Sequence, residues 1–260
     1  MSQMNERSPQ ISIIMATHRD DGFLESSVSS ILDQTDVELE LILVANNCED
    51  SLWQKIQSIS QEMGDSRLRI FRTQIPQLTY NLNFGIDQAR AAFIARMDGD
   101  DISLPGRLKA QYDFLISNPE VSVVGSQVQL IDQMGRIVGR RRLPHDHAQI
   151  VSKMKYANAL CHPSVMFRKD HILHLGGYIG GFQSEDSNLW LRGVGSNKLR
   201  FHNLEQCLLQ YRINPNSAQG SPLAYSEMVG HFAQLFVQYR SWYFFVGLLV
   251  ALLKRIKKSF

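Results

Sequence analysis

The 260-residue sequence lacks most of the features that mark specialised classes of protein. Its three cysteines, Cys48, Cys161 and Cys207, are too few and too widely spaced for a disulfide framework or a C-x-x-C metal pair, so a reducing cytosol is the expected compartment. The polar N-terminus, "MSQMNERSPQ", has no apolar signal core. With 44% hydrophobic and 20% charged residues, the composition is that of an ordinary globular chain with one large domain or a domain with an appendage.

An excess of basic over acidic residues is also lacking over the body of the chain. The 27 basic and 25 acidic residues give a formal charge of +2, and Lys254, Arg255, Lys257 and Lys258 supply +4 at the very end, which leaves −2 elsewhere. A nucleic-acid-binding protein would carry basic charge across its folded body. The sequence therefore predicts no nucleic-acid partner.

Strand and helix patterns alternate through the first hundred residues. Apolar runs at 11–17, 38–46, 68–73 and 92–97 predict buried strands, and helical spacing of apolar residues follows at 23–32, 51–62 and 79–91. This alternation predicts an α/β fold with a mostly parallel sheet and right-handed crossovers. No P-loop, HExxH motif or dinucleotide-binding fingerprint is present.

The second half of the chain is less regular. We expect a helix at 106–117, a strand at 121–132, a basic turn at 134–144, a strand at 161–169, a mobile glycine-rich loop at 176–181 and two short strands at 199–203 and 207–213. A helix is expected to open at Glu185, with Ser184 as its N-cap. Residues 1–215 are interpreted as the catalytic domain and 216–260 as a helical segment.

Three aspartates follow the strand at 92–97, in the stretch "ARMDGDD". Ligands of such sheets bind beyond the carboxyl ends of the strands, where "THRDD", "NNCED" and "DGDD" should converge. If the chain stays extended, Asp98 and Asp100 point the same way, and Gly99 permits close approach to a ligand. Such a pair suits Mg²⁺ or Mn²⁺ holding a diphosphate. The alternative is a strand end in which one aspartate caps the next helix and the others are solvated.

A second acidic pair, Glu185 and Asp186, lies at the predicted helix start. One interpretation is a solvated first turn that the helix dipole stabilises. The other is a general base, which must lie within hydrogen-bond reach of the proton it removes. The glycine-rich loop just before the pair is expected to lie near a substrate.

Together, "ISIIMATHRDDGFLESSVSSILDQT", "LNFGIDQARAAFIARMDGDDISLPGRL", "QYDFLISNPEVSVVGS", "CHPSVMFRK" and "LGGY…SEDSNLWLR" resemble the inverting family 2 glycosyltransferases with a GT-A fold, over roughly residues 10–213. The resemblance implies that Asp98 contacts the nucleotide ribose or the metal and that Asp100 ligates the metal. Asp101 would assist or hold a nearby basic residue. Asp186 would be the catalytic base, with Glu185 the less favoured candidate.

The remaining site residues also follow from the resemblance. It implies a nucleotide-sugar pocket that includes Thr17, Arg19, Asn46, Asn83, Asp98 and Gly99. His162 and Arg168 fall in a stretch that lines the acceptor side, although a strand-end histidine and a surface arginine explain them equally well. Many members have "DDGSTD" after the second strand, where this chain has "ANNCED", so Asn46 replaces an aspartate that reads the base. An asparagine can bond a uracil or a guanine edge, and a UDP-sugar is favoured.

The function that the resemblance implies is transfer of a sugar, with inversion, from a nucleotide-diphosphate sugar to a hydroxyl of a glycan or lipid-linked acceptor. The setting would be the biosynthesis of cell-surface polysaccharide or lipopolysaccharide. A metal-dependent sugar nucleotidyltransferase and a non-catalytic nucleotide-sugar-binding relative are the alternatives. The former would typically have a glycine-rich phosphate loop after its first strand, and "THRDD" contains no glycine before Gly22. A glycosidase would need two carboxylates but no nucleotide crevice.

The C-terminal segment contains a twelve-residue apolar run from Trp242 to Leu253, shorter than the roughly twenty residues that a spanning helix needs. The run is followed by the basic cluster, a pattern that favours a helix lying in the membrane interface. We therefore expect peripheral contact through residues 240–260 with the inner face of the cytoplasmic membrane. The alternative is a terminal helix that packs on the catalytic domain or forms a dimer contact.

Overall fold

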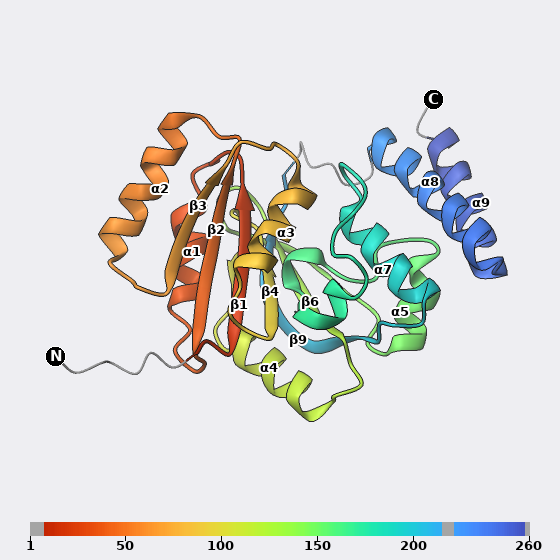
Figure 1. Ribbon diagram of the computed structural model, residues 1–260, viewed down its shortest axis with the longest axis horizontal. Helices are drawn as coiled ribbons and strands as arrows, with labels where there is room; N and C mark the ends of the chain where they lie inside the picture. The colour runs from red at the N-terminus through yellow and green to blue at the C-terminus, as the bar shows by residue number, and fades with distance from the viewer. Residues whose placement is uncertain (1–7, 215–220, 258–260) are drawn as a thin grey trace.

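The computed structural model describes residues 8–214 and 221–257 of the chain (Figure 1). Its centre is a mixed sheet with the strand order β3-β2-β1-β4-β8-β6-β9-β5, and β7 pairs with β6 beside this path. The strands are β1 (Ile11–Thr17), β2 (Leu39–Asn46), β3 (Leu68–Thr73), β4 (Phe93–Met97), β5 (Ile102–Ser103), β6 (Val123–Ile131), β7 (Ile137–Arg141), β8 (Met166–Arg168) and β9 (Phe201–Arg212). The first four strands are parallel, as predicted, whereas β8 runs antiparallel to both β4 and β6.

Helices cover both faces of the sheet, which confirms the α/β class. Side chains alternate across a strand, so Ile13 and Met15 of β1 enter one core while Ile14 and Ala16 enter the other. The first core also contains residues of α1 (Leu24–Leu32), α2 (Asp50–Met63) and α4 (Arg107–Ser117). The second contains residues of α3 (Leu78–Gln88), α5 (His147–Met154), α6 (Lys169–Leu173) and α7 (Glu185–Gly195). Burial on both faces explains why the parallel strands read as continuous apolar runs.

Several local expectations for the second half were wrong. The basic stretch 134–144 contains β7, which forms a hairpin with β6 around Gly135 at φ +76°. The expected strand at 161–169 starts instead with a 3₁₀ turn, His162–Ser164, because Pro163 has no N–H to give to a sheet. The two strands expected at 199–213 form the single strand β9. Ser184 occupies the N-cap position of α7, but its hydroxyl caps no backbone N–H there.

The chain ends in a pair of helices, α8 (Pro222–Tyr239) and α9 (Trp242–Lys257), which lie side by side next to α7 (Figure 1). At Gly247 the backbone of α9 packs against the Phe232 side chain of α8, and a Cβ there would lie 2.2 Å from the ring. Phe232 and Phe244 are buried in the core that also covers the sheet. None of the described helices is both long enough and apolar enough to cross a membrane. The expected domain boundary at residue 215 lies outside the described residues.

Candidate active site

A cleft of about 420 Å³ opens at the carboxyl ends of β1, β2 and β4. It is lined by Ala16, Thr17, His18, Arg19, Asp21, Asn46, Pro76, Gln77, Leu78, Arg96, Asp98, Gly99, Asp100, Phe182, Tyr211, Arg212 and Asn214. The three loops that the strand pattern placed at this edge therefore do converge. Six of the predicted site residues line the cleft: Thr17, Arg19, Asn46, Asp98, Gly99 and Asp100.

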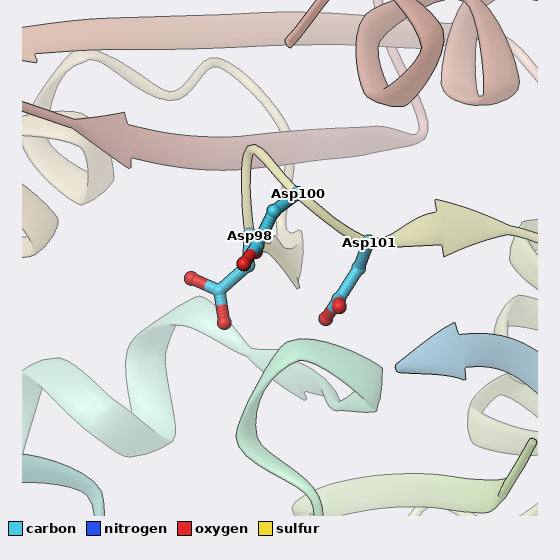
Figure 2. Close-up of side chains that lie close together, drawn as sticks. All are labelled: Asp98, Asp100 and Asp101. Carbon is cyan, nitrogen blue, oxygen red and sulfur yellow. The ribbon is translucent and has the colours of Figure 1, made fainter. Parts of the chain in front are cut away.

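The three aspartates after β4 form one carboxylate cluster. The chain turns at Gly99 and Asp100, so the extended backbone from which the alignment of Asp98 with Asp100 was inferred is not observed. The turn nevertheless brings the three side chains to the same side (Figure 2), and one carboxylate oxygen from each lies within 4.8 Å of the others. Asp101, which follows the turn, belongs to the cluster as fully as the other two.

Negative charge in this cluster is only partly compensated. Asp98 Oδ1 pairs with Arg96 Nη2 at 2.6 Å, and Asp101 Oδ1 accepts the backbone N–H of Arg212 at 2.8 Å. Asp101 Oδ2 is buried and has no hydrogen-bond partner among the described residues. Burial and the neighbouring carboxylates raise the pKa of Asp100 to about 6 and that of Asp101 well above its usual range. Three carboxylates whose oxygens converge, one of them with a buried oxygen that has no partner among the described residues, suit the binding of a hard divalent cation.

Two arginines that the sequence analysis did not single out belong to this cleft. Arg96 is 3% exposed, and its Nε and Nη1 have no hydrogen-bond partner within the described part of the chain. Arg212 donates from Nε to the carbonyl of Asp100 at 2.8 Å, and its guanidinium lies 3.8 Å from the centre of the Phe23 ring. An arginine inside the apolar run before the aspartates was a visible signal for Arg96. Nothing local in the sequence pointed to Arg212, which lies 111 residues beyond Asp101.

The residues expected to bind the nucleotide lie around the ends of β1 and β2. Thr17 donates its hydroxyl proton to the carbonyl of Arg19, and the Arg19 guanidinium pairs with Asp21 at 3.3 Å. Asn46 is 3% exposed, and its buried Oδ1 has no hydrogen-bond partner among the described residues. An unpaired amide oxygen at a cleft wall can accept a hydrogen bond from a ligand.

Two other predicted residues are not brought to the cleft. Asn83, on α3, makes two hydrogen bonds with the backbone of Tyr178. Its Nδ2 donates to the carbonyl oxygen at 2.7 Å, and its Oδ1 accepts the backbone N–H at 2.9 Å. Arg168 pairs in register with Phe93, at the opposite end of β4 from Asp98. Its guanidinium donates to the backbone carbonyls of Leu115, Asn118 and Val121. The structure thus gives both residues contacts that hold the fold.

Glu185 and Asp186 are the first two residues of α7, and their side chains have different surroundings. Glu185 is buried, with Oε1 3.8 Å from Nδ1 of His162, and burial raises its pKa to about 8. Nε2 of His162 lies 2.8 Å from the buried hydroxyl of Tyr178, which belongs to the glycine-rich loop. Asp186 is partly exposed, accepts the backbone N–H of Ser187 at 2.6 Å and lines a second cavity of about 230 Å³. Of the two carboxylates, Asp186 is the one that faces an open space.

The C-terminal helix α8 holds the segment just before this pair. The Glu227 carboxylate accepts the backbone N–H of Phe182 at 2.7 Å, that of Gln183 at 3.0 Å and the hydroxyl of Ser184 at 2.7 Å. These contacts, absent from any local sequence pattern, depress the pKa of Glu227 against the opposing effect of burial. The helical pair is therefore tied directly to the segment that positions Asp186.

The family model described as "Glycosyl transferase family 2" matches residues 12–175. The chain belongs to this family. Over 89% of its length it is 39% identical to the O-antigen biosynthesis glycosyltransferase WbnJ of Escherichia coli, of which it covers 90%. Membership confirms the resemblance and decides against a nucleotidyltransferase.

A second relative is similar in sequence, and two solved structures are similar in fold, to this chain. The chain is 26% identical over 94% of its length to the UDP-Gal:alpha-D-GlcNAc-diphosphoundecaprenol beta-1,3-galactosyltransferase of Escherichia coli, of which it covers 90%. Its fold matches a mannosyltransferase from Pyrobaculum calidifontis solved with GDP-Man and Mn²⁺, with a TM-score of 0.70, 14% identity, and coverage of 97% of this chain and 74% of the other. It also matches residues 1–349 of TarS of S. aureus solved with UDP-GlcNAc, with a TM-score of 0.70, 14% identity and coverage of 95% and 73%.

The raised pKa of Glu185 predicts how stability depends on pH. The folded protein keeps this proton up to about pH 8, whereas the unfolded chain loses it near 4.5, so the free energy of unfolding falls as pH rises between these values. Scanning calorimetry of chelator-treated protein should therefore show a melting temperature that declines from pH 5 to 8. Glu185→Gln should flatten this decline, whereas Glu62→Gln, on the exposed face of α2, should not. An equally steep decline in Glu185→Gln would contradict the assignment.

Proposed function

We propose that this glycosyltransferase moves a sugar from a nucleotide-diphosphate sugar, with a UDP-sugar favoured, to a hydroxyl of a glycan or lipid-linked acceptor with inversion. The process would be cell-surface polysaccharide or lipopolysaccharide biosynthesis. The observation that carries the proposal is that one structure holds a carboxylate cluster in a cleft of about 420 Å³ and a carboxylate, Asp186, facing a separate cavity. The names of the two Escherichia coli relatives support the polysaccharide setting and a donor that carries UDP.

The donor would lie along the cleft. Asn46 would accept a hydrogen bond from the base, and Thr17, Arg19 and the backbone at Gly99 would contact the nucleotide. Asp98 and Asp100 would hold Mn²⁺ or Mg²⁺, which when bound supplies positive charge to the leaving diphosphate. The buried Asp101 carboxylate keeps the turn attached to β9 through the N–H of Arg212.

The chain's own charges support the displacement. The acceptor oxygen attacks the anomeric carbon, the bond from that carbon to the diphosphate oxygen breaks, and the acceptor proton passes to Asp186. One displacement inverts the configuration. The unpaired N–H groups of Arg96 are available to stabilise negative charge that develops on the leaving group. Glu185, with His162 beside it, would orient the start of α7 from the acceptor side.

The decisive experiment is a screen of nucleotide sugars. Purified protein is incubated with UDP-, GDP- and dTDP-linked sugars, and release of nucleoside diphosphate is measured with Mn²⁺, with Mg²⁺ and with a chelator. We expect cation-dependent hydrolysis of one donor and thermal stabilisation by the same donor. Stabilisation without any hydrolysis or transfer would favour a non-catalytic relative, and no response to any donor would contradict the proposal.

We further propose that residues 216–260 form a helical segment that brings the catalytic domain, residues 1–215, to the inner face of the cytoplasmic membrane. One face of α9 exposes Leu249, Leu252, Leu253 and Ile256, at the spacing of a single helix face. The last turns of the helix are basic. An exposed apolar face beside cationic residues suits a helix lying in an anionic membrane surface.

Binding to vesicles tests this surface. Removing two exposed leucines with Leu252→Gln and Leu253→Gln should weaken sedimentation with vesicles containing anionic phospholipid by at least about tenfold, since each buried leucine contributes roughly 1.5–3 kcal/mol. Ile116→Gln, an equally exposed apolar residue on α4, is the matched control and should bind as the unaltered protein does. Unchanged sedimentation of the double variant would rule out this face as the membrane contact.

A further inference from the structure

The second cavity, of about 230 Å³, lies between the sheet-bearing body and the C-terminal helices. Its lining comes from three places: the segment 154–160, which begins at the last residue of α5, the first turns of α7 together with the residues before it, and facing positions on α8 and α9. Asp186, the proposed base, is part of this lining. The cavity is thus distinct from the nucleotide cleft, and the helical pair supplies one of its walls.

Most of the lining is apolar, contributed by Leu160, Leu191, Met228, Phe232 and Val250 among others. An apolar surface of this kind gains free energy when it covers an apolar ligand group. A cavity for a free saccharide alone would instead be expected to present hydrogen-bonding groups over most of its wall. The lining therefore favours a ligand with an apolar part.

The charged members of the lining are two lysines and the carboxylate of Asp186. Lys155 and Lys254 both border the cavity. The Lys155 ammonium lies 5.3 Å from the centre of the Tyr243 ring and Lys254 donates to the carbonyl of Tyr156, contacts that fix both cations at this site. Trp190, 3% exposed, also lines the cavity, and its indole N–H has no hydrogen-bond partner among the described residues.

We infer that this cavity is where the acceptor is bound by its phosphate-linked apolar chain. The phosphate groups pair with Lys155 and Lys254, the first part of the chain covers the apolar wall, and the saccharide presents its hydroxyl to Asp186. The chain then leaves toward the exposed leucine face of α9. This inference rests on the proposed transfer reaction, and it makes the helical pair a part of the acceptor site as well as a membrane contact.

Farnesyl diphosphate is a suitable probe, because it carries the phosphate and the apolar chain without requiring the sugar to be known. Its dissociation constant is measured by titration calorimetry below its aggregation concentration, beside inorganic diphosphate and farnesol. Ala224→Trp places a large ring at the cavity wall, and Lys254→Gln removes one cation. Each should weaken farnesyl diphosphate at least tenfold. Val237→Trp, at a 75% exposed position of α8, is the matched control and should leave binding unchanged.

The outcomes separate this inference from the proposed function. Thermal stabilisation by UDP with Mn²⁺ reports on the nucleotide cleft and shows that each variant is folded. If that stabilisation persists while Ala224→Trp and Lys254→Gln bind farnesyl diphosphate normally, the acceptor inference is wrong and the donor site stands. Inorganic diphosphate binding as tightly as farnesyl diphosphate would also overturn it, because the apolar wall would then contribute nothing. Absent stabilisation of the unaltered protein would count against the proposed donor instead.

Discussion

Replacement of Asp186 by asparagine is expected to lower the rate of sugar transfer by roughly 10²–10⁴-fold, the usual contribution of a general base. Asparagine has nearly the same shape, and its side-chain oxygen can still accept the N–H of Ser187, so the start of α7 should be preserved. The nucleotide cleft does not include Asp186, and the affinity for the donor should therefore change little. Turnover under saturating donor and acceptor, together with calorimetric titration of the donor, measures the two effects separately.

Glu185→Gln is the matched control for this prediction. Glu185 is buried beside His162 with a pKa raised to about 8, so at neutral pH it is largely protonated and a glutamine resembles it closely. We expect a much smaller loss of turnover, and none of the 10²–10⁴-fold reduction that removal of a base produces. If Glu185→Gln abolished transfer while Asp186→Asn remained active, the two roles would have to be exchanged.

The first half of the fold could be predicted from the sequence because its signals are local. Runs such as Ile11–Thr17 and Leu39–Asn46 are buried on both faces, so they appear as unbroken apolar stretches, and the loop that follows each one must reach the same sheet edge. Placement of Asp98 and Asp100 in the cleft followed from this rule alone. The extended backbone that was predicted between Asp98 and Asp100 is wrong, because a glycine permits a turn as readily as a strand.

The rest of the site depends on contacts between distant parts of the chain. Arg212 reaches the carboxylate cluster from β9, and Glu227 reaches the segment before α7 from a helix expected only as an appendage. Neither residue carries a motif, and charge alone does not separate them from the other charged residues of the chain. Asn83 and Arg168 show the converse, because polar residues inside recognisable family segments prove to hold backbone groups. Local pattern predicts where a cleft forms, whereas long-range pairing decides which side chains complete it.

Asp100→Asn should produce the second large effect, through the cation rather than the base. Asp98 is already paired with Arg96. Among the described residues, no basic side chain lies at hydrogen-bond distance from the carboxylate of Asp100, because Arg212 bonds only its backbone carbonyl. Replacing that carboxylate by an amide should weaken Mn²⁺ binding, and turnover should fall by roughly 10²–10³-fold, the scale for losing one element of charge stabilisation. Part of the activity should return at high Mn²⁺ concentration, a behaviour that loss of a base would not show.

Two variants separate this effect from general damage. Asp113→Asn removes an exposed carboxylate on α4 that pairs with Lys109, and it should leave the Mn²⁺ dependence unaltered. Asp101→Asn keeps an oxygen for the N–H of Arg212 but removes a buried carboxyl group whose pKa burial raises well above its usual range. It should therefore bind Mn²⁺ more weakly, while the metal-free protein should be more stable at neutral pH. Calorimetric titration with Mn²⁺ and thermal melting with and without a chelator distinguish these cases. If Asp100→Asn binds Mn²⁺ as tightly as the unaltered protein, the carboxylate cluster would have to position Arg96 and Arg212 rather than bind a metal ion.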